Sequence, residues 1–426
     1  MSLSKLCLAL LTSTAVPFAA SSQQTRSDFA AAVDRIFARF STQNSPGCAV
    51  GVSRNGSTIV TRAYGSANLE YGIPNTTETI FESRSVAKQF TAAAIILLAQ
   101  QGKLSLDDPI RKLLPELPEY ASRVTIRHML NHTSGLRDWG TVASAGGWPR
   151  GLRSHTMAHA LGISRRQKAL NYPPGTEYLY SNTNFTLAAL IAERVSGMSF
   201  AEFMRTRFFV PLGMKNSRWR DDFTRVVRGR ATAYSVAVDG PHIDMPNENV
   251  IGHAGLLTTI ADLLIWNENF TNPKVGGRAF VDEMERRGRL LNGREIDYSA
   301  GLDVSRYRGV PRIYHTGSTA GYRAFLARYP EQRLSIAILC NAGNAGPEPL
   351  GNQVADVFLG GALATPASVD SVTGITLSDE EMTTVAGMYR NVRTAEPLRL
   401  AARGSSRVNG LTMSLGRVRA LHFERN

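Results

Sequence analysis

The sequence is poor in cysteine, in lysine and in charged runs, and each shortage excludes a class of protein. Three cysteines in 426 residues exclude a fold built on several disulfides and a zinc module with paired CxxC motifs. Charged residues make up 19% and apolar residues 43%, so the chain can bury a large core and is not disordered. The net charge is +13, but the 48 basic residues, of which 7 are lysine, are spread without a dense run. We therefore expect no nucleic-acid partner.

The first 22 residues have the pattern of a cleavable export signal. Lys5 supplies a positive start, residues 6–20 are mostly apolar, and residues 19–22 are small enough for a cleavage site. The stretch is too short for a membrane-spanning helix, which needs about 20 apolar residues, and no later segment qualifies. We predict a secreted or periplasmic protein without a membrane span; a retained N-terminal anchor is the alternative.

Residues 23–360 have the pattern of one α+β domain. Asn55-Gly56 joins two strand-like segments, which is typical of a hairpin. Residues 125–274 are predicted to be mostly helical, and strand-like segments return at 312–315, 322–329 and 334–339. Strands at both ends of the domain and hairpin connections predict an antiparallel sheet built from distant segments.

The end of the chain is expected to stand apart from this domain. Residues 361–377 have the composition of a linker, and residues 378–426 contain short strand-like segments. About 50 residues of that kind make a thin core. We therefore predict a short β-rich segment, complete or truncated.

A serine and a lysine are placed for nucleophilic catalysis. Ser85-Val86-Ala87-Lys88 puts a hydroxyl and an amine one turn apart at a predicted helix start. Such an amine can take or share the hydroxyl proton in a crowded, partly dry site, and the helix N-terminus favours developing negative charge. The pattern alone is not specific, since residues 2–5 match it too.

Two later segments supply further polar groups. Residues 180–182 (Tyr-Ser-Asn) follow a Pro-Pro-Gly turn and offer a phenol and an amide, and residues 315–318 (His-Thr-Gly-Ser) end a predicted strand. A helix with serine and lysine, a loop with tyrosine and a strand with small residues can line one cleft. Residues 389–391 match the tyrosine pattern as well.

In these elements the sequence resembles the serine beta-lactamase and penicillin-recognising hydrolase superfamily, in its branch of class C beta-lactamases, D-aminopeptidases and esterases. The resemblance covers about residues 28–360. Further segments typical of this family frame the three elements: 102–109 (Gly-Lys-Leu-Ser-Leu-Asp-Asp-Pro), 130–136 (Leu-Asn-His-Thr-Ser-Gly-Leu), 174–176 (Pro-Gly-Thr), 211–214 (Pro-Leu-Gly-Met) and 254–256 (Ala-Gly-Leu).

The resemblance implies a fold and roles for particular residues. The fold would be a five-stranded antiparallel sheet flanked by helices, with an all-helical subdomain across the cleft. Ser85 would be the acylated nucleophile, and Lys88 and Tyr180 would handle its proton, with Tyr180 the base toward the leaving group and the deacylating water. Asn182 would bind the acyl side of the substrate. The C-terminal piece resembles the start of the β-barrel domains of some D-aminopeptidase-like members, but it looks too short to close one.

The strand at residues 315–318 would bind substrate from the other side of the cleft. Beside Gly317, the backbone N–H of Ser318 would form an oxyanion hole with that of Ser85; one such donor is typically worth ~3 kcal/mol in the transition state. His315 departs from beta-lactamases and cell-wall carboxypeptidases, which usually carry a lysine there to grip a substrate carboxylate. With an ordinary pKa of about 6.5, histidine would be mostly neutral at neutral pH and would gain charge toward pH 6. Esterase-like and D-aminopeptidase-like members often have histidine at this position.

The two cysteines beyond the leader are close in the implied sheet. The strand that starts at Cys48 would lie antiparallel to the strand that ends at Cys340, so a bond is possible if their Cα atoms lie within about 7 Å. We expect two free, buried thiols, because buried unpaired cysteine is common.

The expected activity is that of an exported serine hydrolase that forms an acyl-enzyme and cleaves a small ester, amide or short peptide. A DD-carboxypeptidase or beta-lactamase is the first alternative, and a non-catalytic penicillin-binding protein is the second. We expect no cofactor and no metal: the pairs His128/His132 and His155/His159 lack the glutamate of a metalloprotease helix. His132 is expected to hold a turn. Nothing in the sequence predicts an oligomeric state.

Overall fold

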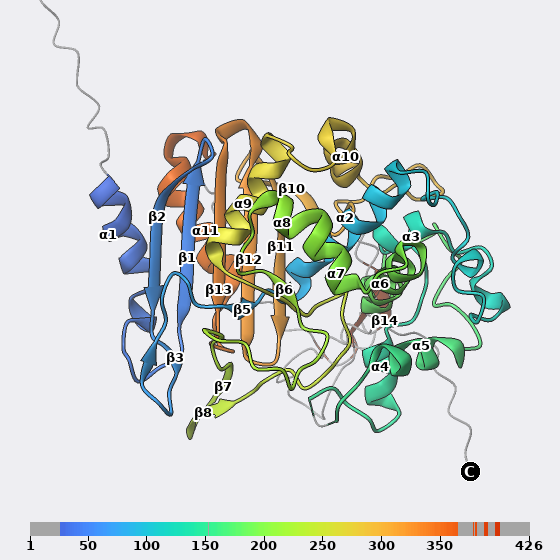
Figure 1. Cartoon of the computed structure of the whole chain (residues 1–426), viewed down its shortest axis with the longest axis horizontal. Helices are drawn as coiled ribbons and strands as arrows, with labels where there is room; N and C mark the ends of the chain where they lie inside the picture. The colour runs from blue at the N-terminus through green and yellow to red at the C-terminus, as the bar shows by residue number, and fades with distance from the viewer. Residues whose placement is uncertain are drawn as a thin grey trace, which may run out of the picture.

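A six-stranded antiparallel sheet forms the centre of the protein. The computed structural model describes residues 26–151, 153–364, 378, 380, 387–390 and 397–400. The strand order is β10-β11-β12-β13-β1-β2, which brings the first two strands of the chain beside the last ones of the domain (Figure 1). The strands are β1 Cys48–Arg54, β2 Ser57–Tyr64, β10 Asp303–Tyr307, β11 Val310–Thr319, β12 Tyr322–Tyr329 and β13 Leu334–Cys340.

The sheet has one strand more than the five that were predicted. The extra strand, β10, pairs with β11 at the edge of the sheet through a turn at Arg308 and Gly309. Both turn residues have positive φ, 45° and 86°, as a two-residue hairpin that follows the twist of the strands requires. The predicted hairpin at Asn55-Gly56 is confirmed, with φ of 53° and 74°. Arg-Gly is a weaker turn signal than Asn-Gly, so the first hairpin was found and the second was missed.

Helices cover both faces of the sheet. On one face α1 (Arg26–Ile36) and α11 (Pro347–Leu359) bury a cluster that includes Val50, Val52 and Ile338. On the other face α9 (Ile260–Thr271) and α2 (Ala87–Gln100) belong to the larger core cluster. Successive strand residues face opposite sides, so β1 contributes to both clusters.

Residues 125–274, predicted to be mostly helical, do contain most of the helices, but fewer than half of these residues are helical, because long loops and short strands separate the helices. The helices between the strands lie beside the sheet (Figure 1): α3 Ile126–Leu130, α4 Trp139–Ala145, α5 Met157–Arg165, α6 Asn182–Ser196, α7 Phe200–Met204, α8 Val210–Leu212 and α10 Gly277–Glu285. Of the short strands, β5 (Phe81–Glu82), β9 (Leu256–Thr258) and β6 (Arg218–Trp219) form a second small sheet. The other short strands pair as hairpins: β3 Ser66–Asn68 with β4 Ile73–Pro74, and β7 Tyr234–Ala237 with β8 Gly240–Ile243.

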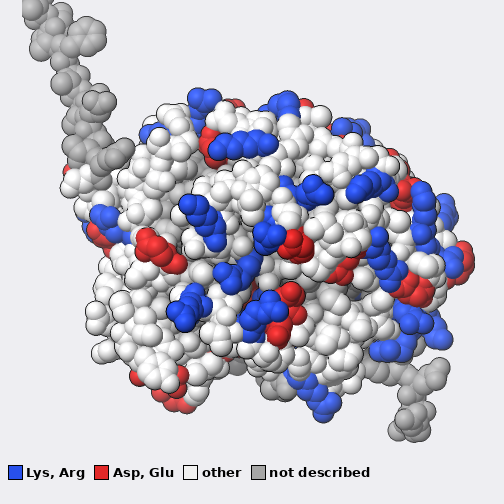
Figure 2. Space-filling view, viewed as in Figure 1, with Lys and Arg blue, Asp and Glu red and all other residues white. Residues whose placement is uncertain are grey.

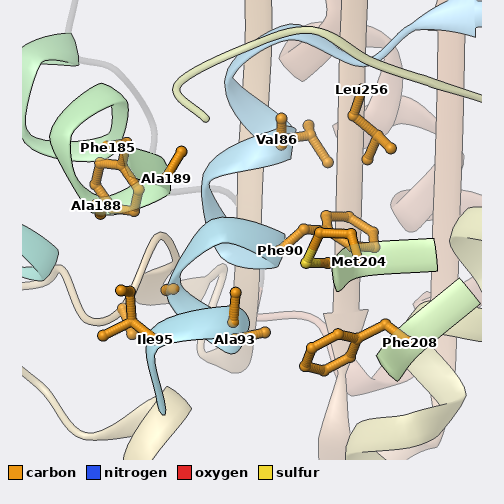
Figure 3. Close-up of a cluster of buried hydrophobic side chains, with 14 of the residues drawn as sticks. Val86, Phe90, Ala93, Ile95, Phe185, Ala188, Ala189, Met204, Phe208 and Leu256 are labelled. Carbon is orange, nitrogen blue, oxygen red and sulfur yellow. The ribbon is translucent and has the colours of Figure 1, made fainter. Parts of the chain in front are cut away.

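Helix α2 lies in the middle of the molecule and is buried along most of its length. Figure 3 shows Phe90 of this helix directed toward Met204, Phe208 and Leu256. Phe90 also stacks on Trp266 of α9, with ring centroids 4.0 Å apart. The small alanine side chains of α2 allow a close approach of α6, which packs on the side of α2 opposite Phe90. Packing on all sides holds the N-terminus of α2, where Ser85 and Lys88 lie, in one place.

The expectation of two free cysteines is wrong. Cys48 and Cys340 are directly opposite each other in the β1–β13 register, and they form a disulfide with Cα atoms 4.0 Å apart. The strand pairing implied by the resemblance allowed this bond; only the register, which puts the two Cα atoms face to face, decides it.

The described part of the C-terminal segment forms one small hairpin. β14 (Gly387–Arg390) pairs antiparallel with β15 (Pro397–Leu400). The predicted export signal, most of the predicted linker and the strands predicted beyond residue 400 lie outside the described residues, so the domain limits stay a prediction. Among the described helices, none is long and apolar enough to cross a membrane.

Candidate active site

Ser85 lies in a tight turn between β5 and α2. The turn is a short 3-10 helix, Arg84–Val86, that runs directly into α2, as the predicted helix start requires. Arg84 has a φ of 55°, a left-handed conformation that is costly for a residue with a side chain. Ser85 itself is partly exposed while both of its neighbours are buried. The turn therefore presents the Ser85 hydroxyl to solvent from an otherwise closed surface.

Lys88 reaches the Ser85 hydroxyl from one turn further along. Its Nζ lies 3.1 Å from Ser85 Oγ and also donates to Asn182 Oδ1 at 3.0 Å and to the carbonyl of His253 at 2.8 Å. Lys88 is fully buried. Three acceptors match the three N–H donors of an ammonium group, so the site holds the lysine in one orientation toward Ser85.

Tyr180 approaches the same hydroxyl from the loop before α6. Its hydroxyl donates to Ser85 Oγ at 2.9 Å, and the Lys88 ammonium lies 4.8 Å from the centre of its ring. The predicted set of Ser85, Lys88 and Tyr180 is thus brought together around one oxygen atom. Asn182 belongs to this group through Lys88, and Asp138 fixes its backbone N–H at 2.7 Å.

The strand β11 lies directly against the nucleophile turn. A Cβ atom on Gly317 would be 2.3 Å from the carbonyl oxygen of Ser83 and 3.2 Å from the backbone nitrogen of Ser85. Only glycine allows the strand this close to the turn. Ser318 follows Gly317 and is exposed.

His315 is buried behind Tyr180, and its ring is held at both nitrogens. Nδ1 lies 2.6 Å from the Thr316 carbonyl, which can only accept, and Nε2 lies 3.0 Å from the Tyr298 hydroxyl. Nδ1 therefore donates, whereas the Tyr298 hydroxyl can either donate or accept, so the pKa of His315 decides the charge of the ring. Burial, and next the positive charge of Lys88, lower the pKa of His315 to about 3. The expectation that His315 gains charge near pH 6 is wrong, because it assumed the pKa of a solvated histidine.

Two aromatic residues of the site were not predicted or not assigned to it. Tyr298 holds His315, and its ring lies 6.4 Å from that of Tyr180. No local pattern marks Tyr298, since it acts only through residues that are distant in sequence. His132 is buried, and its Nδ1 accepts from the backbone N–H of Ser181 at 3.2 Å. It therefore holds the loop that carries Tyr180, as expected of a turn residue.

A buried ion network anchors the turn from behind. Glu82 pairs with Arg84, and Arg220 donates from Nε to the same carboxylate at 2.9 Å. Burial would raise the pKa of Glu82, but the charges of Arg220 and Arg84 hold it well below its usual range. Glu248 pairs with Arg150 and accepts from its Nε at 2.9 Å. The sequence alone did not reveal this network, because Glu82 and Arg220 are 138 residues apart.

Comparison with known proteins shows the family of the chain. The family model described as Beta-lactamase matches residues 33–357. The chain belongs to the beta-lactamase family. It is a serine hydrolase of that family, with D-aminopeptidases and a penicillin-binding protein among its relatives. Within the described residues, no group of three or more His, Cys, Asp or Glu side chains could hold a metal ion.

Two curated relatives illustrate how far the sequence similarity extends. The D-aminopeptidase of Gluconobacter oxydans (strain 621H) is 29% identical over 373 residues, which cover 87% of this chain and 67% of the relative. Penicillin-binding protein 4* of Bacillus subtilis (strain 168) is 29% identical over 312 residues, 68% of this chain and 66% of the relative. The chain thus matches about two thirds of the length of these relatives.

Two solved structures show the same fold. The octameric penicillin-binding protein homologue from Pyrococcus abyssi matches with a TM-score of 0.69 and 24% identity, over 89% of this chain and 86% of that one. The D-amino acid amidase from Ochrobactrum anthropi SV3, complexed with L-phenylalanine amide, matches with a TM-score of 0.65 and 23% identity, over 78% and 98%. At these identities the likeness concerns the fold alone.

Proposed function

We propose that this family member cleaves small amides or esters through a covalent acyl-enzyme on Ser85, with a preference for substrates that lack a carboxylate beside the scissile bond. The observation that carries the proposal is the neutral, buried His315 next to an assembled Ser85, Lys88 and Tyr180. A neutral ring forms no ion pair with a carboxylate, while Lys88 and Tyr180 both lie within hydrogen-bonding distance of the Ser85 hydroxyl.

The chemical steps follow from the positions of the donors. Neither an ammonium nor a neutral phenol can take up a proton, so in the reactive form one member of the Lys88–Tyr180 pair has lost its own proton. The Ser85 oxygen then attacks the carbonyl carbon, and its proton passes to that deprotonated member; both groups lie within 3.1 Å of the hydroxyl. The backbone N–H groups of Ser85 and Ser318 stabilise the oxyanion. Tyr180 returns the proton to the leaving amine or alcohol. A water molecule, activated by Tyr180, then hydrolyses the ester on Ser85.

Asn182 is the proposed contact to the acyl side of the substrate. Its Oδ1 accepts from Lys88, which leaves the Nδ2 amide for a substrate carbonyl. Some relatives are named D-aminopeptidase, a name that suggests a substrate with a free α-amine. Such a substrate fits a site in which His315 adds no positive charge.

We also propose that the protein is exported. The apolar, small-residue pattern of the first 22 residues supports export. The disulfide between Cys48 and Cys340 supports it independently, since disulfides persist in oxidising compartments and are rare elsewhere.

A parallel assay of three compound classes tests the proposed activity. Chromogenic short-chain esters, D-aminoacyl p-nitroanilides and a fluorescent penicillin are incubated with the wild type and with Ser85→Ala. Turnover of an ester or anilide that is lost in Ser85→Ala supports the proposal, and mass spectrometry should show the acyl group on Ser85. Faster turnover of carboxylate-bearing beta-lactams would favour a beta-lactamase or DD-carboxypeptidase instead. Penicillin labelling without any turnover would leave a penicillin-binding protein.

A further inference from the structure

A pocket lies away from the catalytic residues. It has a volume of about 630 Å³ and is bordered by α7, α8, β6 and β9. Neither Ser85 nor Tyr180 lines it. Leu257 of β9 faces the pocket, whereas the preceding Leu256 faces α2 in the core (Figure 3). The small sheet β5-β9-β6 therefore separates this pocket from the core around α2. Its volume is within the range of about 300–1,000 Å³ that is typical of small-molecule sites.

The lining of the pocket carries an excess of positive charge. Five of its residues are basic and three are acidic. Glu202 forms an ion pair with Arg205, with 2.7 Å between the carboxylate oxygen and the guanidinium nitrogen. Within the described residues, Lys215 and Arg218 make no ion pair with a carboxylate. Figure 2 shows Lys and Arg predominating over Asp and Glu on the face of the molecule that carries α7, α8 and β6.

The same pocket also has an apolar part. Phe209, Met214 and Leu257 line it with 2% or less of their surface exposed, and Val210, which also lines it, is 63% exposed. Arg220 also lines the pocket, but its guanidinium is held by the buried Glu82. The exposed cations Lys215 and Arg218 beside this apolar part fit a ligand with one anionic end and an apolar body, because the anion supplies the missing carboxylate partner and the body covers Val210.

We propose that this pocket binds a small amphiphilic anion, such as a medium-chain or aryl carboxylate, with the anionic group at Lys215 and Arg218. Binding in this pocket does not involve the catalytic residues, and it is independent of the substrate that the catalytic site accepts.

The fluorescent sulfonate 8-anilinonaphthalene-1-sulfonate is the first ligand to test, with the complete protein. We expect saturable fluorescence enhancement that octanoate reverses and octanamide, its neutral analogue, does not. The double variant Lys215→Glu/Arg218→Glu should weaken both sulfonate and octanoate binding by about tenfold or more, since it removes two charged hydrogen-bond donors whose effect is reduced by partial solvation. Ester turnover should stay at the wild-type level in this variant.

A charge-matched control separates the pocket from general attraction. Lys103→Glu/Arg166→Glu makes the same change in net charge at two exposed residues outside the pocket and should leave the affinity unchanged. Equal displacement by octanamide, unchanged affinity in the pocket variant, or an equal loss in the control variant would each overturn the proposal. If the double variant unfolds at a lower temperature, the single variant Arg218→Gln provides the same comparison.

Discussion

Replacing Gly317 by alanine tests whether the close approach of β11 to the nucleophile turn sets the reactivity of Ser85. The new Cβ would be 2.3 Å from the Ser83 carbonyl oxygen and 3.0 Å from Arg84 Cβ. Because a relaxed carbon–oxygen contact is about 3.3 Å or longer, the strand and the turn must move apart by about 1 Å. The turn cannot adapt freely, since Arg84 is already in a left-handed conformation and is paired with buried Glu82.

The expected loss is mainly catalytic. A displacement of about 1 Å between reacting groups can cost on the order of 100-fold in rate, and an overpacked contact typically costs about 1–3 kcal/mol of stability. We expect Gly317→Ala to lower kcat by about 100-fold, measured with a chromogenic ester, and to remain folded by circular dichroism.

Gly361→Ala is the matched control. No atom lies within 4 Å of the Cβ that this substitution adds, and Gly361 has no positive φ. It should therefore leave both kcat and thermal stability unchanged. A Gly317→Ala enzyme with nearly wild-type kcat would refute the idea that glycine at this position controls the geometry of the turn.

Three further predictions concern the proton path, the buried histidine and the disulfide. Tyr180→Phe should lower kcat by about 10²–10⁴-fold, the usual range for a proton-transfer group, while the circular dichroism spectrum is retained. The ratio of kcat/KM between a carboxylate-bearing and a neutral ester should stay flat from about pH 5.5 to 8, because the pKa of His315 is about 3 rather than about 6.5. Because the pKa of His315 is lowered to about 3 in the folded protein, the unfolded chain binds a proton at this residue at a higher pH than the folded protein does. Protonation of His315 therefore leaves the free energy of unfolding unchanged above about pH 6.5 and lowers it as the pH falls toward about 3. Between pH 7 and 5 the loss of unfolding free energy, measured with urea, should be about 2 kcal/mol smaller in His315→Gln than in the wild type. The buried His253, whose pKa is also lowered, contributes equally to both proteins. Cys48→Ala/Cys340→Ala should lower the free energy of unfolding by up to about 5 kcal/mol, because the bond closes a loop with a sequence separation of 292.

Each of these predictions has an outcome that contradicts it. Wild-type turnover in Tyr180→Phe would remove the phenol from the proton path. A rising preference for carboxylate substrates on acidification would show that His315 does gain charge. In the denatured, unreduced full chain, a thiol reagent should react with Cys7 alone. Three reactive thiols would mean that Cys48 and Cys340 are not bonded.

The local features of this protein were determined by short stretches of sequence. Asn55-Gly56 formed the predicted hairpin because its positive φ values depend only on the two residues and their neighbours. Ser85 and Lys88 came together because a helical turn brings residues three apart onto one face. Tyr180 was assigned to the same site through the resemblance to a known superfamily, because no local backbone preference brings it close to Ser85.

The remaining features depend on register and packing between segments that are far apart in the chain. The bond between Cys48 and Cys340 follows from a strand register that sets their Cα atoms face to face. The neutral state of His315 follows from its burial and from the charge of Lys88, and the position of the nucleophile turn follows from Glu82 and Arg220. A sequence states which side chains exist and what their local backbone prefers. Desolvation and partners of a buried group are properties of the assembled core, so only the tertiary structure decided them.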